Sequence, residues 1–383
     1  MHWGNNLMIL LRKYLHISSI LVLILIPKNN IAQTFDKHLF SNIQITESDS
    51  SKLFFEVESN TFIRNNEFFG DIVKGYTLLG FNLKPMLLYY PNSKIKLTTG
   101  INVLFYYSID TLNVPLVFSF QYKITPKLDF ILGTINGTVN HKLIDPLFDF
   151  ERYLYNQVEN GVQFLWNGNK FTADLWLDWE FQIFQDDPFQ EKFNVGLSSL
   201  FNIMKNEKYS LSVPFQNLFR HEGGQINDCK KPMATIYNNA IGLSFRRKIN
   251  TKLFNSIRIS SYWLNYFDLS PTKQQKFDSG NGYYGMLEVF NKSFDILFGY
   301  WYGHNWIAPI GNPMFESCSR TNFFVKKPYR ATISNKISYK KEVSKGIYLG
   351  LRFDSYFDLY EKDYEYSWSF LVNFDGKFLL NRR

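Results

Sequence analysis

The chain has 383 residues, of which 45% are hydrophobic and 18% aromatic, and its formal net charge is +8. The basic residues are scattered rather than gathered among stacking aromatic side chains, which argues against binding to nucleic acid. With only two cysteines, Cys229 and Cys318, a disulfide framework does not hold the fold together; whether these two pair is left open. The mean hydropathy is only -0.21, because polar residues alternate with apolar ones.

The first 32 residues have the organisation of a secretory signal peptide. Arg12 and Lys13 precede an apolar run at 17–26, which is shorter than the ~20 residues that a membrane-spanning helix needs. Ala32 offers a small residue at a cleavage site before Gln33. We therefore expect a signal peptide at 1–32 and a polar N-terminal lead at 33–51, with a membrane-anchor helix as the alternative.

The remainder, 52–383, contains about sixteen stretches in which apolar and polar residues alternate with the period of a β-strand. No helical period competes with them over a long window. The expected strands begin near Lys52, Tyr76, Ile95, Val114, Lys127, Gln157, Phe171, Glu191, Tyr209, Ile236, Leu253, Tyr283, Ser293, Arg330, Ile347 and Tyr364.

The connections between these stretches alternate in length. Tight polar turns such as 91–93, 167–169 and 206–207 alternate along the chain with longer segments such as 138–156 and 305–329. The last strand, 364–378, carries an aromatic face and a polar face over about fifteen residues, whereas ordinary strands have about five or six. Long two-faced strands, an even count and alternating loop length predict an all-β fold: a transmembrane antiparallel β-barrel of about sixteen strands with short periplasmic turns and long outer loops.

At this point the chain resembles the porin-like outer-membrane β-barrels of Gram-negative bacteria. Several segments, including 141–146, 159–163, 174–180 and 221–225, look like an uncharacterised barrel family of Bacteroidota. The resemblance implies a place in the bacterial outer membrane, contact with lipid and insertion by the barrel-assembly machinery. Its C-terminus departs from common barrels, which tend to end on an aromatic residue, because 379–383 follow Phe378.

Charged residues on the expected inner face are the first candidates for a functional role. Asp174, Trp176, Asp178 and Glu180 share one face of the strand that begins at Phe171, and their carboxylates repel unless cations or water lie near. Arginines at inward-facing positions of other strands could face them across a pore. We take as pore-lining candidates Asp174, Trp176, Asp178, Glu180, Arg246, Arg258 and Arg352; the alternative is that they are simply solvated interior residues.

The outer loops supply the second set of candidates: His141, Glu151, His221 and Glu222. The long loop 138–156 could fold inward and narrow the pore, or cap the barrel from outside. Glycines at 223 and 224 permit a structured loop after His221, but no helix follows that could complete a phosphate site. We expect no metal and no cofactor, since no histidines pair at ligand spacing.

The sequence therefore predicts an outer-membrane channel that passes small polar solutes by diffusion, selected by pore diameter and lining charge. Trp176 and Trp301 could stack on sugar rings. A non-conducting barrel that serves as subunit or scaffold of an envelope complex is the alternative, and an outer-membrane enzyme the third hypothesis. We expect no enzyme, because Ser261 has no evident histidine partner and no Gly-x-Ser-x-Gly elbow occurs. Oligomeric state is left open.

Overall fold

The alternating stretches form a closed ring of antiparallel strands in the computed structural model, which describes residues 39, 43–107, 109–224, 226, 229, 231–249, 251, 253–322 and 324–382. The expected signal peptide lies outside the described residues. The strands are β1 (Lys52–Glu67), β2 (Thr77–Asn92), β3 (Ile95–Ile101), β4 (Val103–Tyr106), β5 (Ile109–Asn113), β6 (Leu116–Thr125), β7 (Leu128–Thr134), β8 (Asn160–Asn167), β9 (Phe171–Phe181), β10 (Lys192–Lys205), β11 (Tyr209–Glu222), β12 (Ala234–Lys248), β13 (Ser256–Asp268), β14 (Ser279–Phe290), β15 (Phe294–His304), β16 (Tyr329–Ser344), β17 (Ile347–Asp358) and β18 (Tyr364–Arg382).

These eighteen segments make a barrel of sixteen strands. β3 and β4 are two parts of one strand, because β2 pairs with both. β5 and β6 likewise follow one another along the next strand, and the break falls at Pro115, which has no N–H to donate to a ladder. The expected strand count and fold class are thus confirmed. The strand expected to begin near Val114 begins earlier, since β5 precedes that residue.

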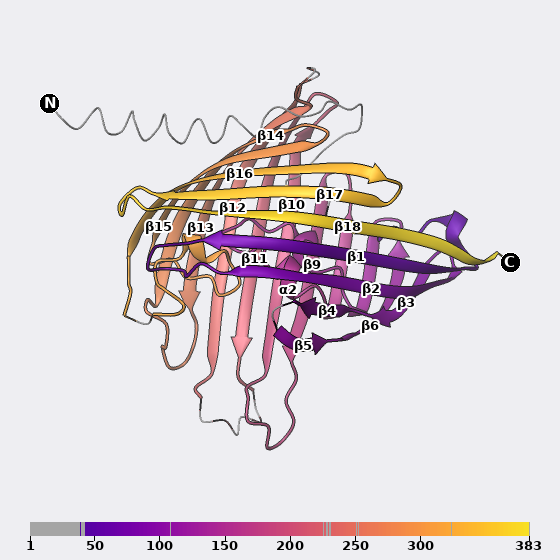
Figure 1. Ribbon diagram of the computed structural model, residues 1–383, viewed down its shortest axis with the longest axis horizontal. Coiled ribbons are helices and arrows are strands. Elements are labelled where there is room, and N and C mark those ends of the chain that lie inside the picture. Colours follow the sequence, from indigo (N-terminus) through magenta and orange to yellow (C-terminus); the bar gives the residue numbers. More distant parts are fainter. Residues whose placement is uncertain are drawn as a thin grey trace. The chain divides into compact units, whose positions relative to one another are not determined.

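The ring closes where the first strand pairs with the last. β1 pairs with β18 from Lys52↔Arg382 to Glu67↔Tyr366, and Figure 1 shows β16, β17, β18, β1 and β2 side by side in the near wall. Closure leaves no unpaired strand edge, which is the condition for crossing a bilayer with strands. Among the described residues, no helix is long and apolar enough to span a membrane.

Burial separates the two faces of each strand. On β9, Leu175 and Phe181 on the outside are 45% and 51% exposed, whereas Asp174 and Asp178 on the inside are 8% and 3% exposed. Apolar side chains thus cover the outer wall and polar ones point inward, the reverse of a water-soluble barrel and the arrangement that suits lipid outside. The burial pattern is therefore that of a transmembrane barrel.

The core lies inside the ring, because two long connections fold inward. The connection between β7 and β8, which we call the plug loop (138–156), contains the short helices η3 (Thr138–His141) and α2 (Arg152–Tyr155); its Leu147 and Leu154 are fully buried. The connection between β15 and β16 contains η4 (Pro313–Phe315) and buries Trp306 and Phe315 against the inner wall. A short 3-10 helix, η2 (Glu47–Asp49), precedes β1.

Candidate functional site

The acidic row on β9 faces the interior, where the sequence placed it, but it meets protein rather than open water. Trp176 is 3% exposed. Asp174 accepts a hydrogen bond from Gln163 at 2.8 Å, and Glu180 pairs with Arg152 and Arg220, each at 3.0 Å. These partners come from the plug loop and from nearby strands, so the row needs no charges on the opposite wall.

The three arginines proposed to face this row lie elsewhere. Arg258 forms an ion pair with Glu288 on the adjacent strand, and Arg246 donates to Ser256 at 3.1 Å. Arg352 pairs with Asp354 at 2.9 Å and lies 3.8 Å from the ring centroid of Phe150 in the plug loop. All three point into the barrel, yet none is brought against Asp174 or Asp178, because strand register gives each a closer carboxylate or hydroxyl.

His141 ties the plug loop to the acidic row. Its Nδ1 lies 2.8 Å from Asp174 Oδ2 and its Nε2 lies 2.9 Å from Glu159 Oε2, while its ring stacks on Trp176 with centroids 3.6 Å apart. Burial opposes a charge on His141, but the two carboxylates outweigh it and raise the pKa of the imidazole to about 10. A histidine held protonated on both nitrogens is an anchor and is unsuited to act as a base.

Glu151 makes the second anchor of the plug loop. Its carboxylate accepts from Arg64 at 2.8 Å and Asn66 at 2.7 Å, and it also binds the hydroxyl of Tyr76. Lys336, fully buried on β16, binds Asp145 of the same loop. The loop is therefore fixed at several points by charges that burial makes costly to separate.

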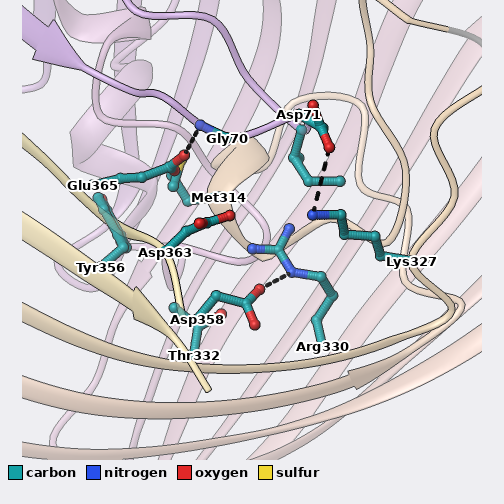
Figure 2. Close-up of a pocket in the computed structure, with 11 residues that line it drawn as sticks. Gly70, Asp71, Met314, Lys327, Arg330, Thr332, Tyr356, Asp358, Asp363 and Glu365 are labelled. Atoms are coloured by element: carbon teal, nitrogen blue, oxygen red, sulfur yellow. Dashed lines mark hydrogen bonds and ion pairs between the residues drawn. The ribbon is translucent and has the colours of Figure 1, made fainter. Parts of the chain in front are cut away.

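A polar cavity lies beside the second inward loop at the outer rim (Figure 2). Arg330 donates to Asp358 at 2.7 Å, and Glu365 accepts from the backbone N–H of Gly70 at 2.6 Å. Figure 2 also shows Lys327 directed toward Asp71. The charges that line this cavity mostly pair with one another, so it contains no evident nucleophile with a base.

Two observations bear on metals and disulfides. No group of three or more histidine, cysteine, aspartate or glutamate side chains in the described part of the chain could hold a metal ion. Cys318 is a free thiol, and burial raises its pKa to about 12, which keeps it protonated and unreactive.

A histidine and a hydroxyl meet on the outside of the barrel, at the outer ends of β11 and β12. His221 pairs in register with Thr235, and its Nδ1 lies 2.8 Å from Thr235 Oγ1. The imidazole stacks on Phe193 with centroids 4.9 Å apart. A hydroxyl within hydrogen-bond reach of a positioned imidazole is the basic unit of nucleophilic catalysis. Glu222, the neighbouring candidate, faces away and accepts from Arg220 at 3.0 Å.

Sequence reasoning singled out His221 but missed Thr235. The two are fourteen positions apart and no local motif joins them; only the register of the β11–β12 hairpin makes them neighbours. The alternation of side chains along each strand was the available signal. His221 shares the outer face of its strand with Phe219, and Thr235 shares the outer face of its strand with Tyr237. The rings of Phe219 and Tyr237 stack on each other.

Solved structures share the architecture. A loop-deletion mutant of OmpT, an outer-membrane protein of Vibrio cholerae, has 9% identity and a TM-score of 0.50, covering 85% of this chain and 99% of that one. OprD from Pseudomonas aeruginosa has 9% identity and a TM-score of 0.49, covering 88% and 96%. OccAB4 from Acinetobacter baumannii has 11% identity and a TM-score of 0.48, covering 86% and 99%. At such identities the likeness concerns the fold alone. No curated protein matches the chain.

A family model described as lipid A 3'-O-deacylase-type matches residues 45–383. The expectation that the protein is not an enzyme is therefore wrong, since that description names an enzyme activity. The expectation failed because it looked for a nucleophile and base joined by a local motif, whereas strand register can join them across two strands. The match covers all but the first 44 residues, and the chain therefore belongs to the lipid A 3'-O-deacylase-type family.

Proposed function

We propose that the protein hydrolyses acyl esters of lipids in the outer leaflet, from the lipid-facing outer wall of the barrel. The observation that carries the proposal is the contact between His221 and Thr235 at the outer ends of β11 and β12. Family membership supports it, because the family is described by removal of an acyl group from lipid A. A site on this wall meets its substrate without extracting it from the membrane.

The chemistry would begin with the hydroxyl of Thr235. His221 Nδ1 takes the proton as Thr235 Oγ1 attacks the ester carbonyl, and the imidazolium then protonates the leaving alkoxide. A water molecule, activated by the same imidazole, would release the fatty acid and restore the threonine. Phe193 holds the plane of the imidazole, and exposed Phe219 and Leu269 beside the pair provide apolar surface for an acyl chain.

The filled interior also supports a reaction on the outside. The plug loop and the 305–328 connection bury large side chains against the inner wall, including Leu147, Trp306 and Phe315. A lipid with several acyl chains is too large to react in such an interior. By contrast, the outer wall is apolar and directly accessible from the leaflet.

The test is hydrolysis by matched variants. Thr235→Val and His221→Asn should each lower the release of fatty acid from lipid A in outer-membrane vesicles by at least about a hundredfold. Thr235→Ser should retain activity. His304→Asn, which changes another outward-facing histidine at an outer strand end, is the control and should be unaffected. Mass spectrometry of extracted lipid A measures the product.

Three results would count against the assignment. Full activity in Thr235→Val and His221→Asn would remove this pair from the chemistry. Loss of activity in His304→Asn alone would move the site to β15. Absence of hydrolysis by correctly folded wild-type protein, with every acylated lipid offered, would remove the enzymatic proposal altogether.

A diffusion channel is the second candidate, and the inward-facing arginines near the turn end favour it. Arg246 and Arg258 both point into the barrel from β12 and β13, away from the two inward loops. Sugar stacking on Trp176 or Trp301 has weaker support, since these rings are 3% and 0% exposed. Single-channel recording in planar bilayers tests this function, and a barrel that neither conducts nor hydrolyses would fit a scaffold.

A further inference from the structure

A row of asparagines crosses the lipid-facing outer wall. Asn217 pairs with Asn239, Asn239 with Asn265, and Asn265 with Asn281, on four successive strands from β11 to β14. Four amides in one register line, which we call the amide row, place a continuous polar strip on a surface that is mostly apolar.

On β11 and β12 the amide row lies within the apolar belt, five residues from the outer strand ends, and it approaches the rim at Asn281, two residues after the start of β14. Exposed apolar residues flank it along the first three strands: Phe215 and Phe219 on β11, Ile241 on β12, and Trp263 and Phe267 on β13, while the half-buried Tyr237 lies on its other side on β12. Asn217 lies five residues before the end of β11, roughly 12 Å from that end for a tilted strand. A polar side chain at such a depth is costly unless something binds it.

The contacts of the amide row leave donors in excess. Asn217 accepts from the Tyr237 hydroxyl at 2.6 Å, Asn239 accepts from Asn265 at 3.0 Å, and Asn265 accepts from Trp263 Nε1 at 3.1 Å. All three carbonyl oxygens thus have a partner. Of the six N–H groups on these three amides, the contacts of the described residues use one. The row therefore offers hydrogen-bond donors to the membrane.

We propose that the amide row binds the acyl carbonyl oxygens of an outer-leaflet lipid. Ester and amide carbonyls accept hydrogen bonds and donate none through oxygen, and they lie at the boundary between headgroups and hydrocarbon, the level of the row. A second copy of the chain would bring the same excess of N–H donors, so self-association would leave most of the donors in the row without acceptors. This binding site is separate from His221 and Thr235 and stands whether or not that pair hydrolyses lipid.

The experiment compares two lipids that differ only in their carbonyls. Purified protein in detergent is titrated with a diester phosphatidylglycerol and with its diether analogue of equal chain length, and bound lipid is counted by native mass spectrometry. We expect the wild-type protein to bind the diester lipid more tightly, by about fivefold for each hydrogen bond that the ether cannot accept. The same titrations with the Thr235→Val variant exclude hydrolysis of the bound lipid during the measurement.

Variants connect the preference to the row. Asn239→Leu with Asn265→Leu should abolish the preference for the diester lipid, and leucine suits a lipid-facing position, so the barrel should still fold. Asn335→Leu is the matched control: Asn335 is an outward asparagine on β16 outside the row, and its variant should keep the preference. Heat-modified migration on gels checks folding of each protein.

The proposal fails if wild-type protein binds the two lipids equally, or if the double variant keeps the preference. It also fails if the double variant changes only the oligomeric state, since the row would then be an interface between copies. Because the readout is bound lipid and not released fatty acid, its failure can be told apart from a failure of the hydrolysis proposal.

Discussion

The imidazole of His141 lies between two carboxylates in the interior of the barrel, and this one side chain joins the plug loop to β9 and to Glu159, which directly precedes β8. Its pKa rises from an ordinary 6.5 to about 10, because Asp174 and Glu159 stabilise the cation more than burial opposes it. A pKa raised in the folded state stabilises that state below the unfolded pKa, and the stabilisation is lost as pH rises through about 10.

The pH dependence of stability tests this anchor. We expect the difference in thermal stability between wild type and His141→Phe to be largest near pH 6, at roughly 3–5 kcal/mol for removing one partner of a buried pair, and to shrink as pH rises from 7 to above 10. Phenylalanine keeps the stack on Trp176. Thermal unfolding in detergent, monitored by circular dichroism, measures this difference in stability.

The outward-facing His304 provides the control for that measurement, since it has a ring contact with Tyr329 and no carboxylate partner in the described part of the chain. Its replacement by phenylalanine should leave the pH profile unchanged. Parallel profiles for wild type and His141→Phe would show that His141 is uncharged in the folded protein.

The plug loop is the element that decides whether the interior is open. Asp145 binds Lys336 of β16, and Glu151 binds Arg64 of β1. His141 binds Asp174 of β9, so the loop is held to the wall at points well apart around the ring. Removing one partner leaves a buried charge without its counter-ion, which favours a loop position with access to water.

Conductance tests the role of the plug loop. We expect wild-type protein in planar bilayers to be mostly closed and Lys336→Met to open frequently, because unpaired Asp145 destabilises the inward position. Lys84→Met is the control: Lys84 pairs with Glu58 inside the barrel but away from the loop, at 3.2 Å and partly exposed. Equal, steady conductance in all three proteins would mean that the loop does not close the barrel.

The whole barrel inverts the usual distribution of side chains, since its exposed face is the apolar one. Ile241 is 48% exposed near the middle of β12, and Ile203 is 55% exposed near the turn end of β10. Both positions face outward, but they differ in depth within the apolar belt.

Depth-dependent substitution tests this orientation in the membrane. Ile241→Arg should destabilise the barrel by about 2–4 kcal/mol, whereas Ile203→Arg near the interface should cost about 0–1 kcal/mol, because the guanidinium there reaches water. Urea unfolding in lipid vesicles measures both. Equal costs at the two positions would contradict the assignment of the belt.

Period-two alternation in the sequence by itself determined the barrel, because the two faces of a membrane strand must differ at every step and so leave a record along the whole chain. It also determined the number of strands and the inward direction of Asp174, Trp176 and Arg352. Only the tertiary structure decided which side chains meet. Strand register aligned His221 with Thr235 and four asparagines with one another, and the inward folding of the plug loop placed His141 between two carboxylates. Such contacts join positions far apart in sequence, and no local pattern encodes them.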